Sequence, residues 1–364
     1  MNAVLVVAGI VGMFLLLIAP HEAGHFALAK LFKVRVIEFS IGAGTKLWSM
    51  TRGGTVYAIR ALPILGYVRM GGMEAGDFED PNGFHRKAAW QRILILIAGP
   101  AANFLVAMVI AGGIELTQLN TDPGKVLTLV PGSPAASVGM QSGDSIRTVN
   151  GKPVNAIGLV KDEEGAAPGA PLVLTGVHPN GKPFTVTVTP KTYDSKTNTW
   201  STCDLQNPCQ IGIGMPRRLI GWQTAVTDGV KFPFVVIGGL VTGLSQLVTG
   251  EVPGGLLGPN GVTGPIGIGE VATQAVGLGF DTYLGFVALL SVALGFTNLL
   301  PFLALDGGRI VVVVIEALRR RPFNRTAELN VQRFGLVTLL ALAVYISALD
   351  IIRIASGQFP VLQR

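Results

Sequence analysis

The segment LLLIAPHEAGHFALAK, from Leu15 to Lys30, places two histidines and a glutamate in a run that is otherwise apolar. Ionisable side chains are costly inside a bilayer, so within an apolar helix they mark function by default. His21 and His25 are four residues apart, and this spacing puts both imidazoles on one face of a helix, where they can share one ion. Glu22 lies beside them and can act as a general base on a metal-bound water. The segment therefore predicts a catalytic metal site, and its nitrogen ligands suit zinc.

The composition places this segment in a membrane protein. Of 364 residues, 49% are hydrophobic and only 14% are charged, whereas a soluble domain carries about 25% charged residues. The net charge of +6 could indicate nucleic-acid binding. The basic residues cluster beside apolar runs, however, so we interpret them as topology determinants and predict no nucleic-acid partner.

Four segments are long and apolar enough to cross a bilayer, which takes about 20 residues. They cover about residues 3–31, 93–116, 283–300 and 334–354. A fifth apolar segment, 232–250, is shorter and interrupted by glycines and polar residues. We expect this segment to lie at the membrane interface or against the helix bundle rather than to span.

The distribution of Lys and Arg predicts the orientation of the spans, since short cytoplasmic loops carry an excess of both. Basic residues follow the first span, precede the second and separate the third from the fourth: Lys30, Lys33 and Arg35; Arg86, Lys87 and Arg92; Arg319, Arg320, Arg321, Arg325 and Arg333. These loops are expected in the cytoplasm. Both termini and the segment between the second and third spans are then expected outside.

Two regions between the spans have β-sheet patterns. Residues 34–72 alternate apolar and polar side chains with glycine turns, which is typical of β-hairpins. Residues 125–214 are polar and rich in turn signals, and they predict a soluble β domain. Its Cys203 and Cys209 are the only cysteines, and a local disulfide between them is plausible if the domain is extracytoplasmic.

The third metal ligand has to come from another part of the chain. The best candidate is Asp306 in NLLPFLALDGGRI, at the cytoplasmic end of the third span, where Gly307 and Gly308 would let the backbone approach closely. A turn or helix cap is the alternative, since Asp-Gly is a common turn dipeptide. Asn298 lies one or two turns away and is predicted to hold substrate backbone or stabilise an oxyanion. A packing hydrogen bond between helices is its alternative.

At this point the chain resembles the site-2 protease family of intramembrane zinc metalloproteases, in particular the bacterial regulator-of-sigma-E protease branch with one PDZ domain. HEAGH and NLLPFLALDGG are similar to the two metal motifs of the family. The resemblance implies His21, His25 and Asp306 as Zn²⁺ ligands and Glu22 as the catalytic base. AGPAANF carries the family's G-x-x-x-N pattern as Gly99 and Asn103, for which close helix packing is the simpler explanation.

The resemblance also assigns roles to the β regions. The hairpin region is similar to a membrane-associated one proposed to present substrate as an added strand, which implies substrate contacts from Gly66, Tyr67, Val68, Arg69 and Met70. VPGSPAASVGMQSGDSIRTVNGKPV, residues 130–154, resembles bacterial protease PDZ domains, which bind extended peptide termini. The implied substrates are single-pass membrane proteins, such as anti-sigma factors or remnant signal peptides, in the bacterial inner membrane.

The expected fold class is a polytopic α-helical membrane protein of about four spans, with a membrane-associated β-hairpin region and an inserted extracytoplasmic PDZ domain. The expected segments are 1–31, the first span with HExxH; 32–75, the hairpin region; 76–92, a cytoplasmic loop; 93–116, the second span; 122–215, the PDZ domain; 216–281, an interfacial linker; 282–318, the third span with the Asp-Gly motif; 319–333, a basic cytoplasmic loop; and 334–356, the fourth span.

Two other functions remain open at this point. A zinc-binding transporter or sensor could use the same ligands without hydrolysis, although it would need no base at Glu22. An inactive scaffold could act through the PDZ domain alone. The remaining histidines, His85 and His178, are expected on the protein surface.

Overall fold

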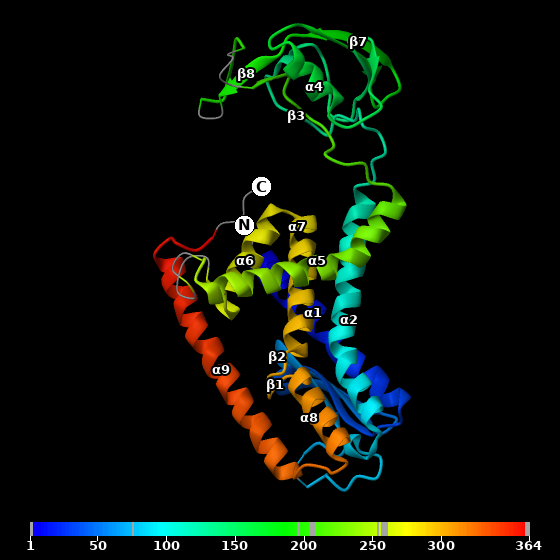
Figure 1. The fold of residues 1–364 in the computed structure, drawn as a ribbon, viewed down its shortest axis with the longest axis vertical. Coiled ribbons are helices and arrows are strands. Elements are labelled where there is room, and N and C mark those ends of the chain that lie inside the picture. Colours follow the sequence, from blue (N-terminus) through cyan, green and yellow to red (C-terminus); the bar gives the residue numbers. More distant parts are fainter. Residues whose placement is uncertain are drawn as a thin grey trace. The chain divides into compact units, whose positions relative to one another are not determined.

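The computed structural model describes residues 3–74, 76–194, 197–203, 208–252, 255 and 261–360 (Figure 1). Its helices are α1 (Ala3–Leu31), η1 (Phe84–Arg86), α2 (Ala89–Thr117), α3 (Pro134–Ser137), α4 (Leu159–Ala166), α5 (Trp222–Thr249), α6 (Pro265–Leu278), α7 (Phe280–Leu299), α8 (Asp306–Arg319) and α9 (Arg325–Ala355). Its strands are β1 (Val36–Arg52), β2 (Thr55–Met70), β3 (Thr128–Leu129), β4 (Ser145–Val149), β5 (Lys152–Pro153), β6 (Leu172–Val177), β7 (Pro183–Val188), β8 (Lys191–Asp194), β9 (Thr199–Ser201), β10 (Cys209–Gln210) and β11 (Ile213–Gly214).

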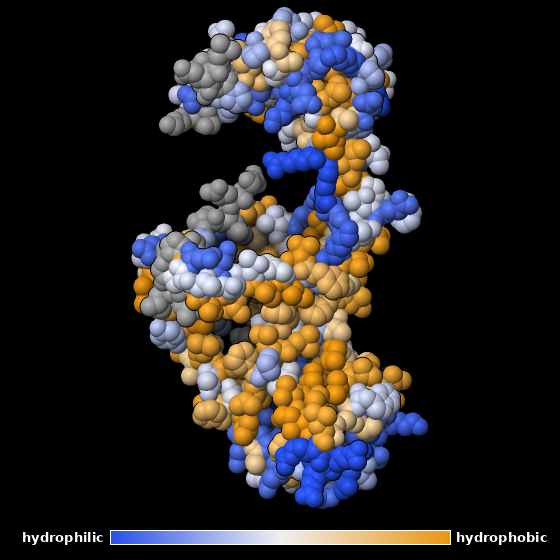
Figure 2. All heavy atoms as spheres, in the orientation of Figure 1, coloured by the Kyte–Doolittle hydropathy of each residue, from blue (hydrophilic) through white to orange (hydrophobic). Residues whose placement is uncertain are grey.

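The chain divides into two compact units. The first, Met1–Ile114 with Asp228–Arg364, contains the long apolar helices and the β1–β2 hairpin. The second, Glu115–Thr227, contains the remaining strands. The first unit carries a broad hydrophobic surface over its helices (Figure 2), as expected of a protein whose solvent is lipid.

Five helices of the described chain are long and apolar enough to cross a membrane, against the four that we predicted. The additional one is α5, which contains the segment 232–250 and forms a helix of 28 residues. Its glycines do not break the helix, and a Cβ at Gly238, Gly239 or Gly243 would meet nothing within 4 Å. Figure 1 shows α5 running crosswise to α2 and α7. Length and composition make α5 a candidate span, and its interfacial placement stays a prediction.

The region 32–75 folds as one long antiparallel hairpin that bends back on itself. The register places four segments side by side in the order 48–52, 55–59, 38–41 and 66–70. The last segment lies directly against α1, because a Cβ at Gly66 would come within 2.6 Å of Ile18 Cγ2 and 2.9 Å of Glu22 Cγ. The hairpin therefore brings one edge of its sheet to the HEAGH motif.

The segment 282–318, expected to hold the third span and the Asp-Gly motif, contains two helices. α7 ends at Leu299, and α8 begins at Asp306. Leu300 is extended (φ −65°, ψ 146°), as is favoured for a residue before proline, and Pro301 has no N–H to continue the helix. A Cβ at Gly307 would lie 2.2 Å from the Leu299 carbonyl oxygen, so the chain turns too tightly there for a side chain.

The second unit has its own core under three small sheets. The largest has the order β5-β4-β6-β7, a second has the order β10-β8-β9, and β11 pairs with β3. The buried core is apolar and includes Val126, Ile146, Leu172, Leu174 and Ile211. Cys203 and Cys209 form a disulfide. Of the predicted domain 122–215, residues 195–196 and 204–207 lie outside the described residues, as do 253–254 and 256–260 of the predicted linker.

One carboxyl group of this unit predicts a pH-dependent stability. Glu164 Oε1 accepts a hydrogen bond from Ile211 N at 3.0 Å. Burial raises the pKa of Glu164 above its ordinary value, although this bond opposes the shift. A pKa raised by folding favours the protonated form in the folded state, so stability is highest below the unfolded pKa and falls as pH rises through the folded pKa. Glu164→Gln keeps an acceptor for Ile211 N and removes the charge. We expect it to stabilise the fragment 115–227 by on the order of 1 kcal/mol at neutral pH, measured by urea unfolding.

The neighbouring Glu163 supplies the matched control for this prediction. Hydrogen bonds from Lys152 and Asn150 lower the pKa of the partly buried Glu163, which among the described residues is paired with a cation, unlike Glu164. Glu163→Gln is therefore expected to leave the stability unchanged or lower it slightly at neutral pH. Equal effects of the two substitutions would contradict the role of burial at Glu164.

Candidate metal centre

Three donor atoms from two distant parts of the chain converge at one point. α1 supplies His21 and His25 from successive turns, and α8 supplies Asp306 as its first residue. The two Nε2 atoms lie 3.2 Å apart. Asp306 Oδ2 lies 3.3 Å from each of them. Both histidines are buried, at 7% and 6% exposed.

The spacing of these atoms fits a zinc ion. Zinc in proteins is bound tetrahedrally with Zn–N distances of about 2.0 Å, and a tetrahedron of that size has edges of about 3.3 Å. The three separations between the donor atoms, 3.2–3.3 Å, all match this edge. His25 Nδ1 donates to the Ile95 carbonyl oxygen at 2.8 Å, which leaves the lone pair of its Nε2 directed at the cluster. Three protein donors leave a fourth position open, as catalytic zinc sites require.

α2 approaches this cluster so closely that only glycine fits at two positions. A Cβ at Gly24 would lie 2.2 Å from the Ala98 carbonyl oxygen. A Cβ at Gly99 would lie 2.3 Å from His25 Nε2 and 2.9 Å from His21 Nε2. The backbone of α2 therefore forms one wall of the site. The sequence indicated that Gly99 serves close helix packing. In the structure it also lies against the Nε2 side of both imidazoles.

A pocket of about 580 Å³ opens onto the three donors. The predicted site residues that line it are His21, Glu22, His25, Gly66, Tyr67, Val68, Arg69, Met70, Asn298 and Asp306. All the residues that we predicted from the two motifs and the hairpin thus share one cavity. Asn298 Nδ2 lies 3.4 Å from His21 Nε2, so this amide reaches the donor cluster.

The hairpin edge in this pocket has room for another strand. Residues 66–70 pair with residues 36–41 of β1 along one edge. Among the described residues no strand pairs with the other edge, and these residues line the pocket. An exposed strand edge is a template for an extended peptide.

Two charged residues of the pocket, Glu74 and Arg309, were not predicted from the sequence. Arg309 lies one turn after Asp306 on α8 and lines the cavity, and its Nε is buried without a hydrogen-bond partner in the described chain. The letters LDGGR contain this signal, because a helix places residues three apart on one face. Leu329 and Gln332 of α9 also line the pocket, and no local pattern indicated them.

Asn103, the other half of the G-x-x-x-N pattern, is fully buried but does not line this pocket. Its backbone carbonyl oxygen accepts a hydrogen bond from Ser291 Oγ of α7 at 2.9 Å. This contact ties α2 to α7. Within the described residues its side-chain amide has no partner.

Apolar helices long enough to span a bilayer, joined to a buried His-His-Asp cluster beside a glutamate, define a membrane protein with a hydrolytic metal centre. The sequence model of peptidase family M50 matches residues 9–342. The chain belongs to this family, which is the site-2 protease family, and it is a zinc metalloprotease.

Relatives similar over nearly the whole chain carry matching names. A putative zinc metalloprotease of Clostridium perfringens is 33% identical, and the alignment covers 96% of this chain and 97% of the relative. One from Fusobacterium nucleatum is 32% identical over 92% of this chain and 95% of the relative. Zinc metalloprotease RasP of Bacillus licheniformis is 28% identical, and the alignment covers 92% of this chain and 96% of the relative. The cofactor is therefore Zn²⁺, as predicted from HEAGH.

Proposed function

We propose that this protein hydrolyses peptide bonds in or near the transmembrane segments of single-pass membrane proteins, with zinc held by His21, His25 and Asp306. The observation that carries the proposal is the cluster of three donor atoms, 3.2–3.3 Å apart, in a pocket shared with Glu22. Bound zinc supplies Lewis-acid polarisation of a carbonyl and activation of water. The other steps depend on residues of the chain.

Glu22 is the group that takes the proton from the attacking water and returns it to the leaving amide nitrogen. It follows His21 directly on α1 and lines the pocket together with both histidines. Asn298, within hydrogen-bond range of the cluster, is placed to donate to the substrate carbonyl oxygen as negative charge develops there.

Water and substrate need access to a site between apolar helices. One side of the pocket is polar, since Arg69, Glu74, Arg309 and Gln332 line it, and Arg69 pairs with Glu74 at 2.7 Å. These side chains give water a hydrogen-bonded route to the donors.

A helical substrate has its backbone amides satisfied internally, so it has to unwind before attack. The open edge of residues 66–70 can replace the lost hydrogen bonds by pairing with the extended substrate. This pairing holds the scissile bond beside Glu22, because the edge lies against α1 there.

The placement in the cell is part of the proposal. The basic loops favour a bacterial inner membrane location with the site near the cytoplasmic side and both termini outside. The second unit acts as an extracytoplasmic PDZ domain that binds peptide termini or restricts bulky substrates. The disulfide is consistent with an oxidising compartment. Substrates of the anti-sigma-factor or remnant-signal-peptide type fit this arrangement.

Zinc removal and restoration test the proposed function. The purified full chain in detergent is incubated with a single-pass substrate, and the products are mapped by mass spectrometry. We expect cleavage in or next to the apolar segment, loss of cleavage after removal of zinc by 1,10-phenanthroline, and recovery when zinc is returned.

Soluble peptides of the same sequence without the apolar segment are the control and should be poor substrates. Cleavage confined to soluble regions would contradict the intramembrane assignment. Zinc bound without cleavage of any of several single-pass substrates would favour a transporter or sensor instead.

A further inference from the structure

A second pocket, of about 490 Å³, lies at the C-terminal end of α8, whereas Asp306 is at the N-terminal end. The segments around this pocket are those that the charge pattern assigns to the cytoplasmic side. Its walls come from η1, the start of α2, the end of α8 and the loop into α9. The charged side chains that line it are Glu79, Arg86, Arg92, Glu316, Arg320, Arg321 and Arg325, together with His85. Five arginines therefore face two glutamates.

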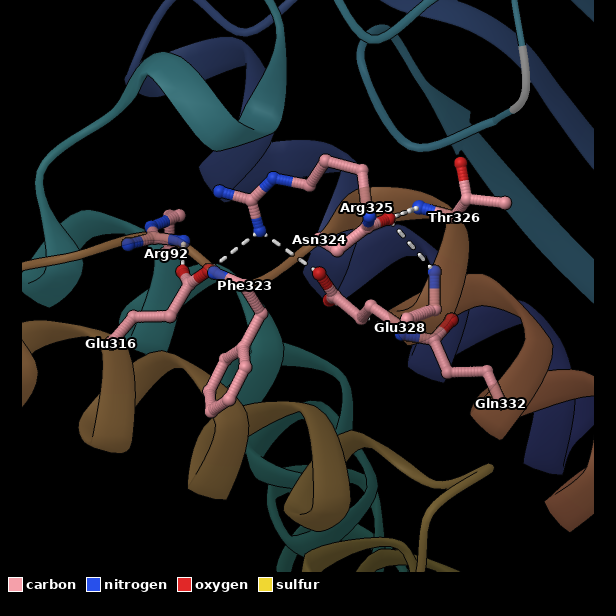
Figure 3. A network of polar contacts seen from close by, with 9 residues as sticks. Arg92, Glu316, Phe323, Asn324, Arg325, Thr326, Glu328 and Gln332 are labelled. Carbon is pink, nitrogen blue, oxygen red and sulfur yellow. Dashed lines mark hydrogen bonds and ion pairs between the residues drawn. The ribbon is translucent and has the colours of Figure 1, made fainter.

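Glu316 is the buried carboxylate of this pocket, and both of its oxygens already accept hydrogen bonds. Glu316, 5% exposed, accepts hydrogen bonds from Arg92 NH1 at 2.7 Å through one oxygen. Its other oxygen accepts from Arg325 NH1 at 2.7 Å and from Phe323 N at 2.8 Å. Figure 3 shows these groups converging on Glu316, with Glu328 on the far side of Arg325. The single carboxylate of Glu316 thus pairs with the guanidinium groups of both Arg92 and Arg325. The pocket therefore keeps a net positive charge.

Several donors of the pocket have no acceptor. Arg92 is only 8% exposed, and its Nε is buried without a partner in the described chain, as is His85 Nδ1. No described residue pairs with the guanidinium groups of Arg320 or Arg321. Among the described residues, Arg86 is paired with the exposed Glu79 alone. Buried polar atoms normally have partners, so Arg92 Nε and His85 Nδ1 indicate a missing partner in this pocket. The exposed guanidinium groups of Arg320 and Arg321 are available as further donors.

His85 reports the positive field in the pocket. Burial, followed by the charges of Arg325 and Arg92, lowers its pKa to about 4. We had expected His85 on the surface, whereas the structure half-buries it on η1, where it lines the pocket together with the arginines. A neutral imidazole adds no further positive charge and can donate or accept one hydrogen bond.

The surface next to the pocket is apolar. Leu318 of α8 is 79% exposed and Trp90 of α2 is 57% exposed. Figure 2 shows hydrophilic residues gathered at this end of the first unit, directly beside the hydrophobic surface of the helices. Tryptophan at such a boundary is typical of the headgroup level of a membrane. The positive charge of the pocket and its place beside an apolar surface therefore favour binding of an amphipathic anion over a soluble one.

We propose that this pocket binds the phosphate headgroup of an anionic phospholipid, with Arg92, Arg320 and Arg321 as donors to the phosphate and the acyl chains along the apolar face of α8. Guanidinium groups suit phosphate because they present several N–H donors in a planar fork. The site is separate from the metal centre and shares none of its lining residues.

The test measures lipid retained by the full-length protein. The chain is reconstituted in nanodiscs of phosphatidylcholine mixed with phosphatidylglycerol, released into mild detergent, and examined by native mass spectrometry. We expect the native chain to retain phosphatidylglycerol in preference to phosphatidylcholine. The variant Arg320→Gln/Arg321→Gln removes two exposed donors outside the buried network, and retention should fall by about thirtyfold, since each basic residue near a lipid headgroup contributes about a factor of five.

The matched control is Lys33→Gln/Arg52→Gln, which removes two exposed positive charges from the same side of the first unit but outside the pocket. It should retain phosphatidylglycerol like the native chain. Equal loss in both double variants would overturn the proposal in favour of non-specific surface attraction. Displacement of the lipid by millimolar inorganic phosphate would also overturn it, because the pocket would then be a site for a soluble anion.

Discussion

Glu22→Gln is expected to lower the rate of substrate cleavage by on the order of a hundred- to ten-thousandfold, the usual contribution of a general acid–base group. Glutamine has nearly the shape of glutamate but cannot take a proton from water. The metal donors are the imidazoles and Asp306, so zinc should remain bound at one ion per chain. The measurement combines the cleavage rate in detergent with zinc content by atomic emission.

The matched control for this prediction is Glu74→Gln. Glu74 is the third carboxylate that lines the same pocket, after Glu22 and Asp306, and it is half exposed and paired with Arg69. The substitution Glu74→Gln removes the same charge as Glu22→Gln but at a residue outside the donor cluster. We therefore expect the rate of substrate cleavage to change by only a few-fold. Cleavage by Glu22→Gln at more than a tenth of the native rate, with zinc retained, would contradict the assignment of Glu22 as the base.

The local part of the site could be predicted from the sequence because helix geometry determines it. Residues four apart on a helix face the same way, so HEAGH alone requires the two imidazoles to meet. The pairing with Asp306 was also predictable in outline, since charge counting places both motifs at cytoplasmic ends of spans. The structure places one donor atom from each of these three side chains within 4.8 Å of the others.

What the sequence did not reveal depends on contacts between distant segments. α8 is a separate helix that starts at Asp306, and the sequence did not show that Gly307 and Gly308 approach the carbonyl oxygens of Leu299 and Phe302. The edge position of residues 66–70 follows from the bent register of the hairpin, which alternation of side chains cannot specify. Glycines in the segment 232–250 suggested an interruption, yet Gly238, Gly239 and Gly243 lie inside one continuous helix, where a Cβ at each would meet nothing within 4 Å.

The contact between Gly99 and the imidazoles likewise joins two distant segments of the chain, and the sequence alone could not show it. We expect Gly99→Ala to weaken zinc binding by about 10- to 100-fold or more, the range found when groups that orient metal ligands are disturbed. The added methyl group would lie 2.3 Å from His25 Nε2, so the imidazole has to leave the position from which it faces Asp306. Cleavage should fall with the zinc content, and added zinc should restore part of it. Zinc affinity is measured by competition with a chelator of known strength.

Gly113→Ala is the control on the same helix, because a Cβ at Gly113 meets nothing within 4 Å. Both substitutions replace glycine by alanine inside α2, and both should favour the helix by about 1 kcal/mol through backbone propensity alone. Any difference between them therefore comes from the contact with the imidazoles and not from the helix. If Gly99→Ala binds zinc as tightly as Gly113→Ala and cleaves at the same rate, then Gly99 serves helix packing only. The wall that α2 forms beside the histidines would then have no role in holding the metal.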